Sequence, residues 1–131
     1  MRASFGSTGV RVLLALPLAV PLTAQTTQRV SVDALGRQAS GPSSFSAISG
    51  DGRYAAFSSF AADIVPGDTN GVEDVFVHDR QTNRIERVSV STDGTQGDFE
   101  SLASVFTADG RYVAFESWAT NLASGDTNSA K

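Results

Sequence analysis

The sequence contains no cysteine and only one histidine, one tryptophan and one methionine. Without cysteine, thiol catalysis, iron–sulfur clusters, thiolate zinc sites and disulfide bonds are excluded. A lipid anchor on a cysteine that follows a leader is excluded for the same reason. The absence is compatible with export, because an exported chain without thiols cannot form mispaired disulfides.

Positive charge is also scarce. The chain has 10 Lys and Arg residues against 14 Asp and Glu residues, and its net charge is −4. The arginines are not clustered, and an acidic surface repels phosphate, so we do not expect nucleic-acid binding. The sequence has no Gly-x-Ser-x-Gly nucleophile motif and no Gly-rich phosphate loop, which leaves a serine hydrolase or a nucleotide-binding enzyme unsupported.

The N-terminal segment has the pattern of a secretory signal peptide. Arg2 and Arg11 precede the apolar run Val12–Leu22, which ends shortly before Ala24. We predict a signal peptide over residues 1–24 with cleavage after Ala24, and an uncleaved amphipathic or buried helix is the alternative. The apolar run is too short to cross a bilayer, so we expect no stable membrane span. The predicted location is exported, either periplasmic or extracellular.

After this leader the chain repeats itself. The segment Arg29–Glu73 recurs without a gap at Arg87–Lys131, 58 residues later, and 20 of the 45 aligned pairs are identical. Unrelated β segments would not keep one register over that length. A fixed period of this size is typical of propellers and other stacked arrays.

Each period has the pattern of four short strands, which we predict at Phe45–Ser49, Tyr54–Ser59, Asp74–Asp79 and Ile85–Val90. The first two are joined through Asp51-Gly52, a tight-hairpin signal because glycine adopts positive φ without steric cost. No stretch after the leader shows a helical apolar period. The sequence therefore predicts an all-β fold of antiparallel, four-stranded propeller-blade repeats.

The repeats are too few to close a propeller. Within 25–131, we predict that 29–33 is the outer strand of a preceding blade, that 45–91 is a full blade and that 103–131 is a partial blade. A propeller needs about four to eight blades, so this one is incomplete. We expect either a fragment of a longer product or open strand edges that pair with other chains.

The hairpin and the strand that follows it carry a family resemblance. Asp51-Gly52-Arg53-Tyr54 is followed by Ala56-Phe57, and the same residues recur from Asp109 onward. Together with the Asp-Val-Phe-Val-x-Asp strand at Asp74–Asp79, this pattern resembles the repeats of TolB-like β-propellers. The resemblance implies a propeller fold and protein partners at the cell envelope.

One loop has residues that suit a hard cation. Asp68, Asn70 and Asp74 place oxygen donors around Gly71, and calcium prefers such ligands. The spacing does not follow the twelve-residue calcium loop. The alternative is a tight turn in which Asp68 and Asn70 bond neighbouring backbone amides. We keep both interpretations, a calcium site and an Asx-type turn.

The remaining candidates have simple structural alternatives. His78 is the only histidine and could act as an acid–base group, but a histidine with no nearby nucleophile is more often a surface or packing residue. Trp118 could present an aromatic platform to a sugar or a peptide, whereas its match to Phe60 in the first copy favours packing. We assign Asp51 and Asp109 to the hairpin turns, and Tyr54 and Tyr112 to the sheet face.

These observations predict an exported, non-enzymatic propeller repeat protein or fragment that binds other proteins, and they predict no cofactor other than a possible calcium ion. Two alternatives stay open. One is the propeller portion of a larger exported hydrolase of peptidase type, with its catalytic domain elsewhere. The other is a calcium-dependent surface protein.

Overall fold

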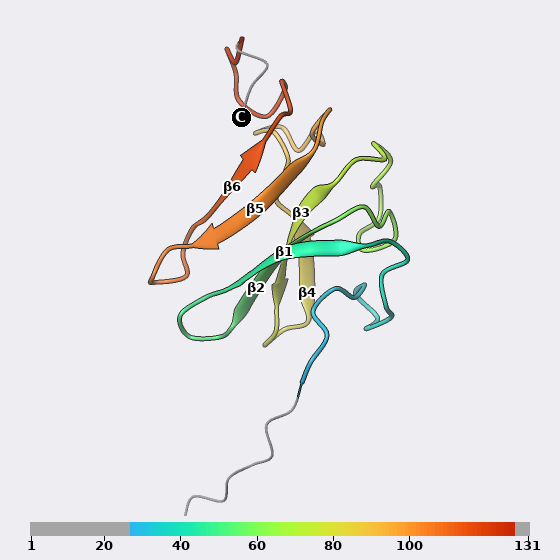
Figure 1. The fold of residues 1–131 in the computed structure, drawn as a ribbon, viewed down its shortest axis with the longest axis vertical. Helices are drawn as coiled ribbons and strands as arrows, with labels where there is room; N and C mark the ends of the chain where they lie inside the picture. Colours follow the sequence, from blue (N-terminus) through green and yellow to red (C-terminus); the bar gives the residue numbers. More distant parts are fainter. Residues whose placement is uncertain (1–26, 128–131) are drawn as a thin grey trace, which may run out of the picture.

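The computed structural model describes residues 27–127, and within that range every regular element is a strand. The strands are β1 (Ser43–Ile48), β2 (Tyr54–Ser59), β3 (Asp74–Asp79), β4 (Arg84–Arg87), β5 (Ser101–Phe106) and β6 (Val113–Ser117). The first four form one antiparallel sheet in chain order, and the last two form a second, two-stranded sheet (Figure 1). The all-β prediction is confirmed, and the two sheets do not close on each other.

The four-stranded sheet is built on the β2–β3 pair, which runs in one register from Tyr54 opposite Asp79 to Ser59 opposite Asp74. Phe57 faces Phe76 across the pair, and their rings stack at 5.8 Å between centroids. The hairpin that leads into β2 turns at Gly52, whose φ of 72° requires the left-handed region. Both central strands match the predicted bounds.

The sequence repeat is also a structural repeat. β5 lies 58 residues after β1 over its whole length, and β6 falls within the equivalent of β2. Isolated bridges join Val32 to Gln38 and, 58 residues later, Val90 to Gln96. Both β1 and β5 carry an irregularity in register at equivalent places, and in β1 this includes Phe45 at a positive φ of 44°.

The core lies on one face of the four-stranded sheet. Phe57, Phe76 and Ile85 point to that face from three neighbouring strands. The hairpin at 32–38 and the loop after β2 cover them, so that the complete buried cluster consists of Val32, Ala39, Phe57, Ala61, Ile64, Phe76 and Ile85. The segment before β1 is therefore part of the core of the four-stranded sheet.

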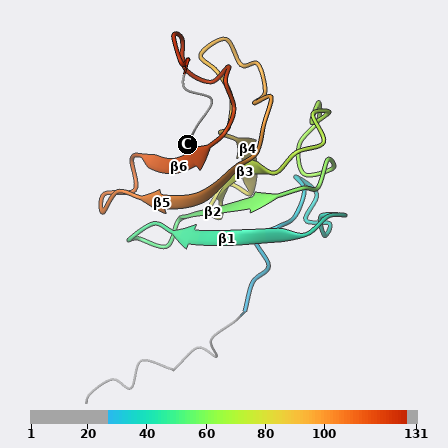
Figure 2. The same cartoon turned by 45° about the horizontal axis from the view of Figure 1, so that its top comes forward.

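The second sheet packs on the other face of the first. β5 lies mainly against β1 and β2, and less against β3 (Figure 2). The Tyr54 ring on β2 meets the Phe106 ring on β5 at 6.4 Å between centroids. The hairpin tips lie together as well, because a Cβ added at Gly110 would be 3.2 Å from Ser49 Cβ.

Three predicted strands differ from the structure. The strand predicted at Phe45–Ser49 runs from Ser43 to Ile48. Residues 29–33 form no named strand and contribute only the bridge from Val32. The strand predicted at Ile85–Val90 runs from Arg84 to Arg87. It ends there because the Ser89 hydroxyl, 3.1 Å away, accepts the Val75 N–H that a longer strand would bond with a carbonyl.

The predicted signal peptide, residues 1–24, lies outside the described residues. Among the residues that are described, no helix is long and apolar enough to cross a membrane.

Candidate functional site

The structure brings the three predicted calcium ligands together, and two of them, Asp68 and Asp74, contact the guanidinium of Arg87. Arg87 Nη1 lies 3.0 Å from Asp68 Oδ1 and 3.4 Å from Asp74 Oδ2. The side chains of Arg87, Asp68 and Asp74 are 11%, 4% and 0% exposed. Water is largely excluded from this cluster, so the ion pairs are weakly screened. The cation between the two carboxylates is therefore the arginine.

Asn70 presents its nitrogen to the same carboxylate. Its Nδ2 donates to Asp74 Oδ2 at 2.8 Å, and its Oδ1 accepts from Val72 N–H at 3.3 Å. Ser89 Oγ donates to the other oxygen of Asp74 at 2.5 Å. In this arrangement Asp74 accepts hydrogen bonds on both oxygens, and the Asn70 oxygen bonds the backbone two residues onward, as in an Asx turn.

Charge in the cluster is not balanced, because two buried carboxylates face one guanidinium. Burial and the neighbouring charge of Asp74 raise the pKa of Asp68, and Arg87 only partly opposes them. Arg87 Nε is buried and has no hydrogen-bond partner in the part of the chain that the structure describes. A group of three or more acidic or histidine side chains that could hold a metal does not occur in residues 27–127. Calcium binding stays a prediction, and it would require both carboxylates to turn away from Arg87.

The same loop joins the two repeats. Asn70 Nδ2 also donates to the carbonyl of Gly97 at 2.9 Å. Gln96 Nε2 donates to Thr69 Oγ1 at 2.9 Å, and Thr69 N–H donates back to Gln96 Oε1 at 3.3 Å. Three hydrogen bonds thus hold the loop of the first copy to the hairpin that begins the second.

His78 lies in the interior and is fully buried. Its Nδ1 is 3.2 Å from the Val30 carbonyl oxygen, and its Nε2 is 3.0 Å from Asn83 Oδ1. These contacts connect β3 to the segment before β1 and to the β3–β4 turn. Among residues 27–127 the partners of the two ring nitrogens are a backbone carbonyl and an amide oxygen, and His78 holds the segment before β1 onto the sheet.

The two hairpin aspartates do the same task in each copy. Asp51 accepts from the Ser49 hydroxyl at 2.6 Å, and Asp109 accepts from the Thr107 hydroxyl at 2.6 Å. These hydroxyl hydrogen bonds, together with one from a backbone N–H, lower the pKa of both carboxyls. Each aspartate therefore stabilises the turn that sets its strand pair, as the sequence predicts.

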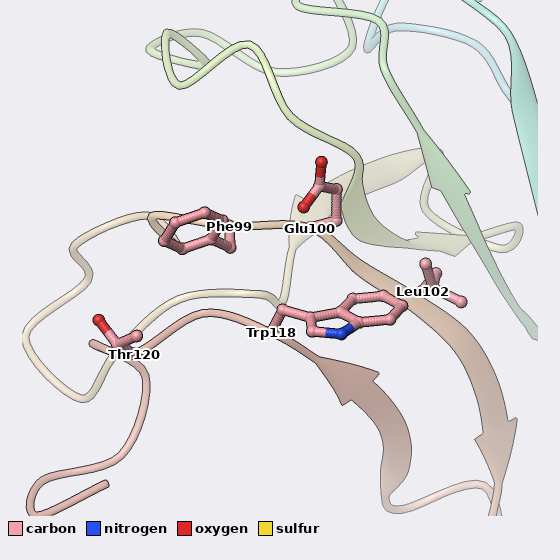
Figure 3. A pocket seen from close by; sticks show the side chains of 5 residues that line it. All are labelled: Phe99, Glu100, Leu102, Trp118 and Thr120. Carbon is pink, nitrogen blue, oxygen red and sulfur yellow. The ribbon is translucent and has the colours of Figure 1, made fainter. Parts of the chain in front are cut away.

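An apolar pocket lies at the end of the second sheet. Its volume is about 530 Å³, and it is lined by Phe99, Glu100, Leu102, Trp118 and Thr120. In Figure 3 the Trp118 indole extends across the strands toward Leu102, and the Glu100 carboxylate points away from the indole. Aromatic and aliphatic walls with one carboxylate suit an apolar or a basic side chain of a partner.

The pocket exists because the two copies differ at a few positions. Phe99, Leu102 and Trp118 occupy the places of Gly41, Ser44 and Phe60. In the first copy a Cβ at Gly41 would lie 2.8 Å from the Ala61 backbone nitrogen, so the chain passes too close for any side chain. In the second copy the close approach to Ala119 is made instead by Gly97. Phe99 is thereby free to form a wall.

Sequence reasoning assigned Trp118 to packing because of its match to Phe60, and it did not single out Phe99 or Leu102. The available signal was the set of positions at which the copies disagree. The pocket holds only one titratable side chain, Glu100.

No protein-family model, curated protein or solved structure matches this chain.

Proposed function

We propose that this chain is an exported, non-enzymatic repeat protein of the TolB-like β-propeller kind, which binds another protein at the cell envelope through the open face of its second repeat. That face consists of the pocket around Trp118 and the exposed side chains Val105 and Tyr112. The predicted leader at 1–24 would direct the protein to the periplasm or the exterior.

The propeller assignment rests on the agreement between the two copies. Glycines with positive φ recur 58 residues apart at 36 and 94, at 52 and 110, and at 67 and 125. The four-stranded antiparallel sheet has the strand order of one blade, and the two-stranded sheet has the order of the first half of the next. The described residues thus support about one full blade and part of another.

The binding proposal is carried by one observation, which is that an apolar face is covered in the first copy and open in the second. Ala56 is fully buried beneath β5, whereas its equivalent Ala114 is exposed. Tyr112 is 64% exposed. The open face also carries Glu116 opposite Leu102. Exposed apolar side chains beside a tryptophan pocket are typical of protein interaction sites.

A photo-crosslinking amino acid at Thr120, on the wall of the pocket, tests this function. We expect discrete protein adducts when the labelled chain is irradiated in an envelope fraction. The matched control carries the same group at Leu35, which is exposed on the N-terminal hairpin away from the pocket. Adducts of equal yield at both positions, or none at Thr120, would contradict the proposal.

Trp118 offers a second measurement, because it is the only tryptophan in the chain. Burial by a bound protein should shift its fluorescence emission to shorter wavelength. The shift should be lost in Leu102→Asp, which places a charge on the pocket wall, and retained in Leu35→Asp.

A further inference from the structure

The interface between the two repeats is a head-to-tail contact, and both of its surfaces recur unused at opposite ends of the described chain. Inside the chain, the face of β2 that carries Tyr54 receives Phe106 from β5. The equivalent of Tyr54 is Tyr112, and the equivalent of Phe106 is Ile48. Tyr112 and Ile48 are 64% and 59% exposed.

We infer that the partner of the open face is a second copy of this chain, whose β1 docks on β5 and β6 as β5 docks on β1 and β2. This inference rests on the proposed function and names its partner. The contact is heterologous, so it leaves one free surface at each end and grows into short chains or a ring.

Burial along the inner strands supports this occupant. Ser101 on β5 is fully buried against the first repeat, and its backbone N–H donates to the Glu73 carbonyl at 2.7 Å. Its equivalent on β1, Ser43, is exposed. Every strand position of β1 except Ala47 is exposed. β1, the strand that would dock on the second copy, is therefore exposed. It is also the equivalent of β5, which makes the same contact inside the chain.

The receiving surface is present in two strands, with Leu102 and Glu116 in the places of Ser44 and Ser58. β5 lies mainly against β1 and β2 inside the chain, and the second sheet consists of the equivalents of those two strands. Strand alternation places Leu102, Val105 and Tyr112 on the face that corresponds to the covered one. A docking β1 would bring Ile48 to Tyr112 and would cover Val105.

A difference between the two repeats, Gly50 in the first and Ala108 in the second, makes the contact between copies looser than the internal contact. At Gly50 an added Cβ would lie 2.9 Å from the Ala108 carbonyl oxygen, so the internal hairpins approach closely only because residue 50 is glycine. In the contact between two copies, residue 108 takes that place, and it is an alanine. Its methyl group must push the partner's hairpin aside. The variant Ala108→Gly removes this obstacle.

Sedimentation velocity of the full chain over a range of concentrations tests the inference. We expect the wild type to associate as concentration rises, and Ala108→Gly to lower its apparent dissociation constant. Ile48→Asp and Tyr112→Asp should each weaken self-association by about tenfold or more, because each buries a charge in the contact. Leu35→Asp adds the same charge at an exposed hairpin position whose equivalent in the second copy is already Asp93, and it should associate like the wild type.

A mixture of the two disrupted variants is the decisive sample. Ile48→Asp keeps an intact Tyr112 surface and Tyr112→Asp keeps an intact Ile48 surface, so together they should form a one-to-one dimer that does not grow. Association of the wild type that survives both substitutions, or a mixture that stays monomeric, would overturn the head-to-tail contact. A monomeric wild type and a monomeric Ala108→Gly would overturn it as well.

The crosslinker at Thr120 separates this inference from the proposed function. An adduct with twice the mass of the chain is the expected product. Adducts to other envelope proteins, with the chain itself monomeric, would reject the second copy and leave the binding function standing. No adduct of either kind would reject both.

Discussion

Arg87 Nη1 lies 3.0 Å from Asp68 Oδ1, and the two side chains are almost entirely withdrawn from water. Truncation of one partner in such a pair leaves the other as a buried, uncompensated charge. Here Asp74, also within reach of Arg87, would lose its ion pair in the same step.

We therefore expect Arg87→Ala to lower the free energy of unfolding by about 3–5 kcal/mol, measured by urea titration. The matched control is Arg84→Ala, because Arg84 pairs with Glu86 at the surface. Its cost should stay below about 1 kcal/mol. Equal urea midpoints for the two variants would show that the buried cluster does not stabilise the fold.

The Arg87 guanidinium should also determine whether calcium binds at Asp68 and Asp74. We expect millimolar calcium to leave the melting temperature of the wild type unchanged, because the arginine already bonds both carboxylates. In Arg87→Ala those oxygens are released, and calcium should raise the melting temperature of that variant. The double variant Arg87→Ala with Asp68→Asn should lose the effect. A calcium-dependent rise in the wild type would instead support the calcium site predicted from the sequence.

His78 should keep the segment before β1 attached to the four-stranded sheet. His78→Ala removes the ring that contacts the Val30 carbonyl and Asn83, so the segment before β1 should open more often. We expect trypsin to cut at Arg29 and Arg37 several-fold faster in this variant. The increase in rate should roughly equal the increase in the population of the open segment. Cleavage at Arg84, in β4, serves as the internal reference. Unchanged relative rates would show that the ring does not tether the segment.

Acid should destabilise the fold by protonating aspartates whose pKa is lower in the folded chain than in the unfolded chain. The Ser91 hydroxyl, followed by the Thr95 backbone N–H, lowers the pKa of Asp93 from 3.8 to about 2. The hydrogen bonds from Arg53 lower the pKa of Asp79 further still. A carboxyl whose folded pKa lies below its unfolded value stabilises the fold above the unfolded value, and that contribution is lost as the pH falls through the folded value.

We expect the urea midpoint to fall between pH 4 and pH 2. Ser91→Ala, which removes the main donor to Asp93, should flatten this fall, and so should Asp93→Asn. The burial of Asp68 works in the opposite sense, because its raised pKa favours protonation in the folded state. A midpoint that is independent of pH in the wild type, or equal slopes in all three proteins, would contradict the assignment.

Local pattern was sufficient for the central strands. β2 and β3 have the predicted bounds because alternating apolar residues and the Asp51-Gly52 turn act over a few residues. β4 ended early because a side chain, the Ser89 hydroxyl, replaced a backbone carbonyl as the acceptor for Val75. The pattern of apolar and polar residues does not predict that a side-chain hydroxyl will replace a backbone carbonyl.

The site was less accessible to sequence reasoning, because it depends on contacts between distant residues. Asp68, Asn70 and Asp74 lie close together, but the cation between the two carboxylates, Arg87, comes from β4. Its presence at the same place in both copies, as Arg29 and Arg87, was a usable signal. The pocket depends on which glycine makes the close approach to the neighbouring segment. This is Gly41 in the first copy and Gly97 in the second, and only the backbone distances show the difference.

The hydrogen bonds from Thr69 and Asn70 to the hairpin at Gln96 and Gly97 have a thermodynamic consequence. In a linear array, each unit is stabilised by itself and by its neighbour, so these bonds belong to the coupling between units. Strong coupling makes the two repeats melt in one transition, and weak coupling lets the second repeat, with its two-stranded sheet, melt first. Removal of the Gln96 amide would therefore split one heat-capacity peak into two.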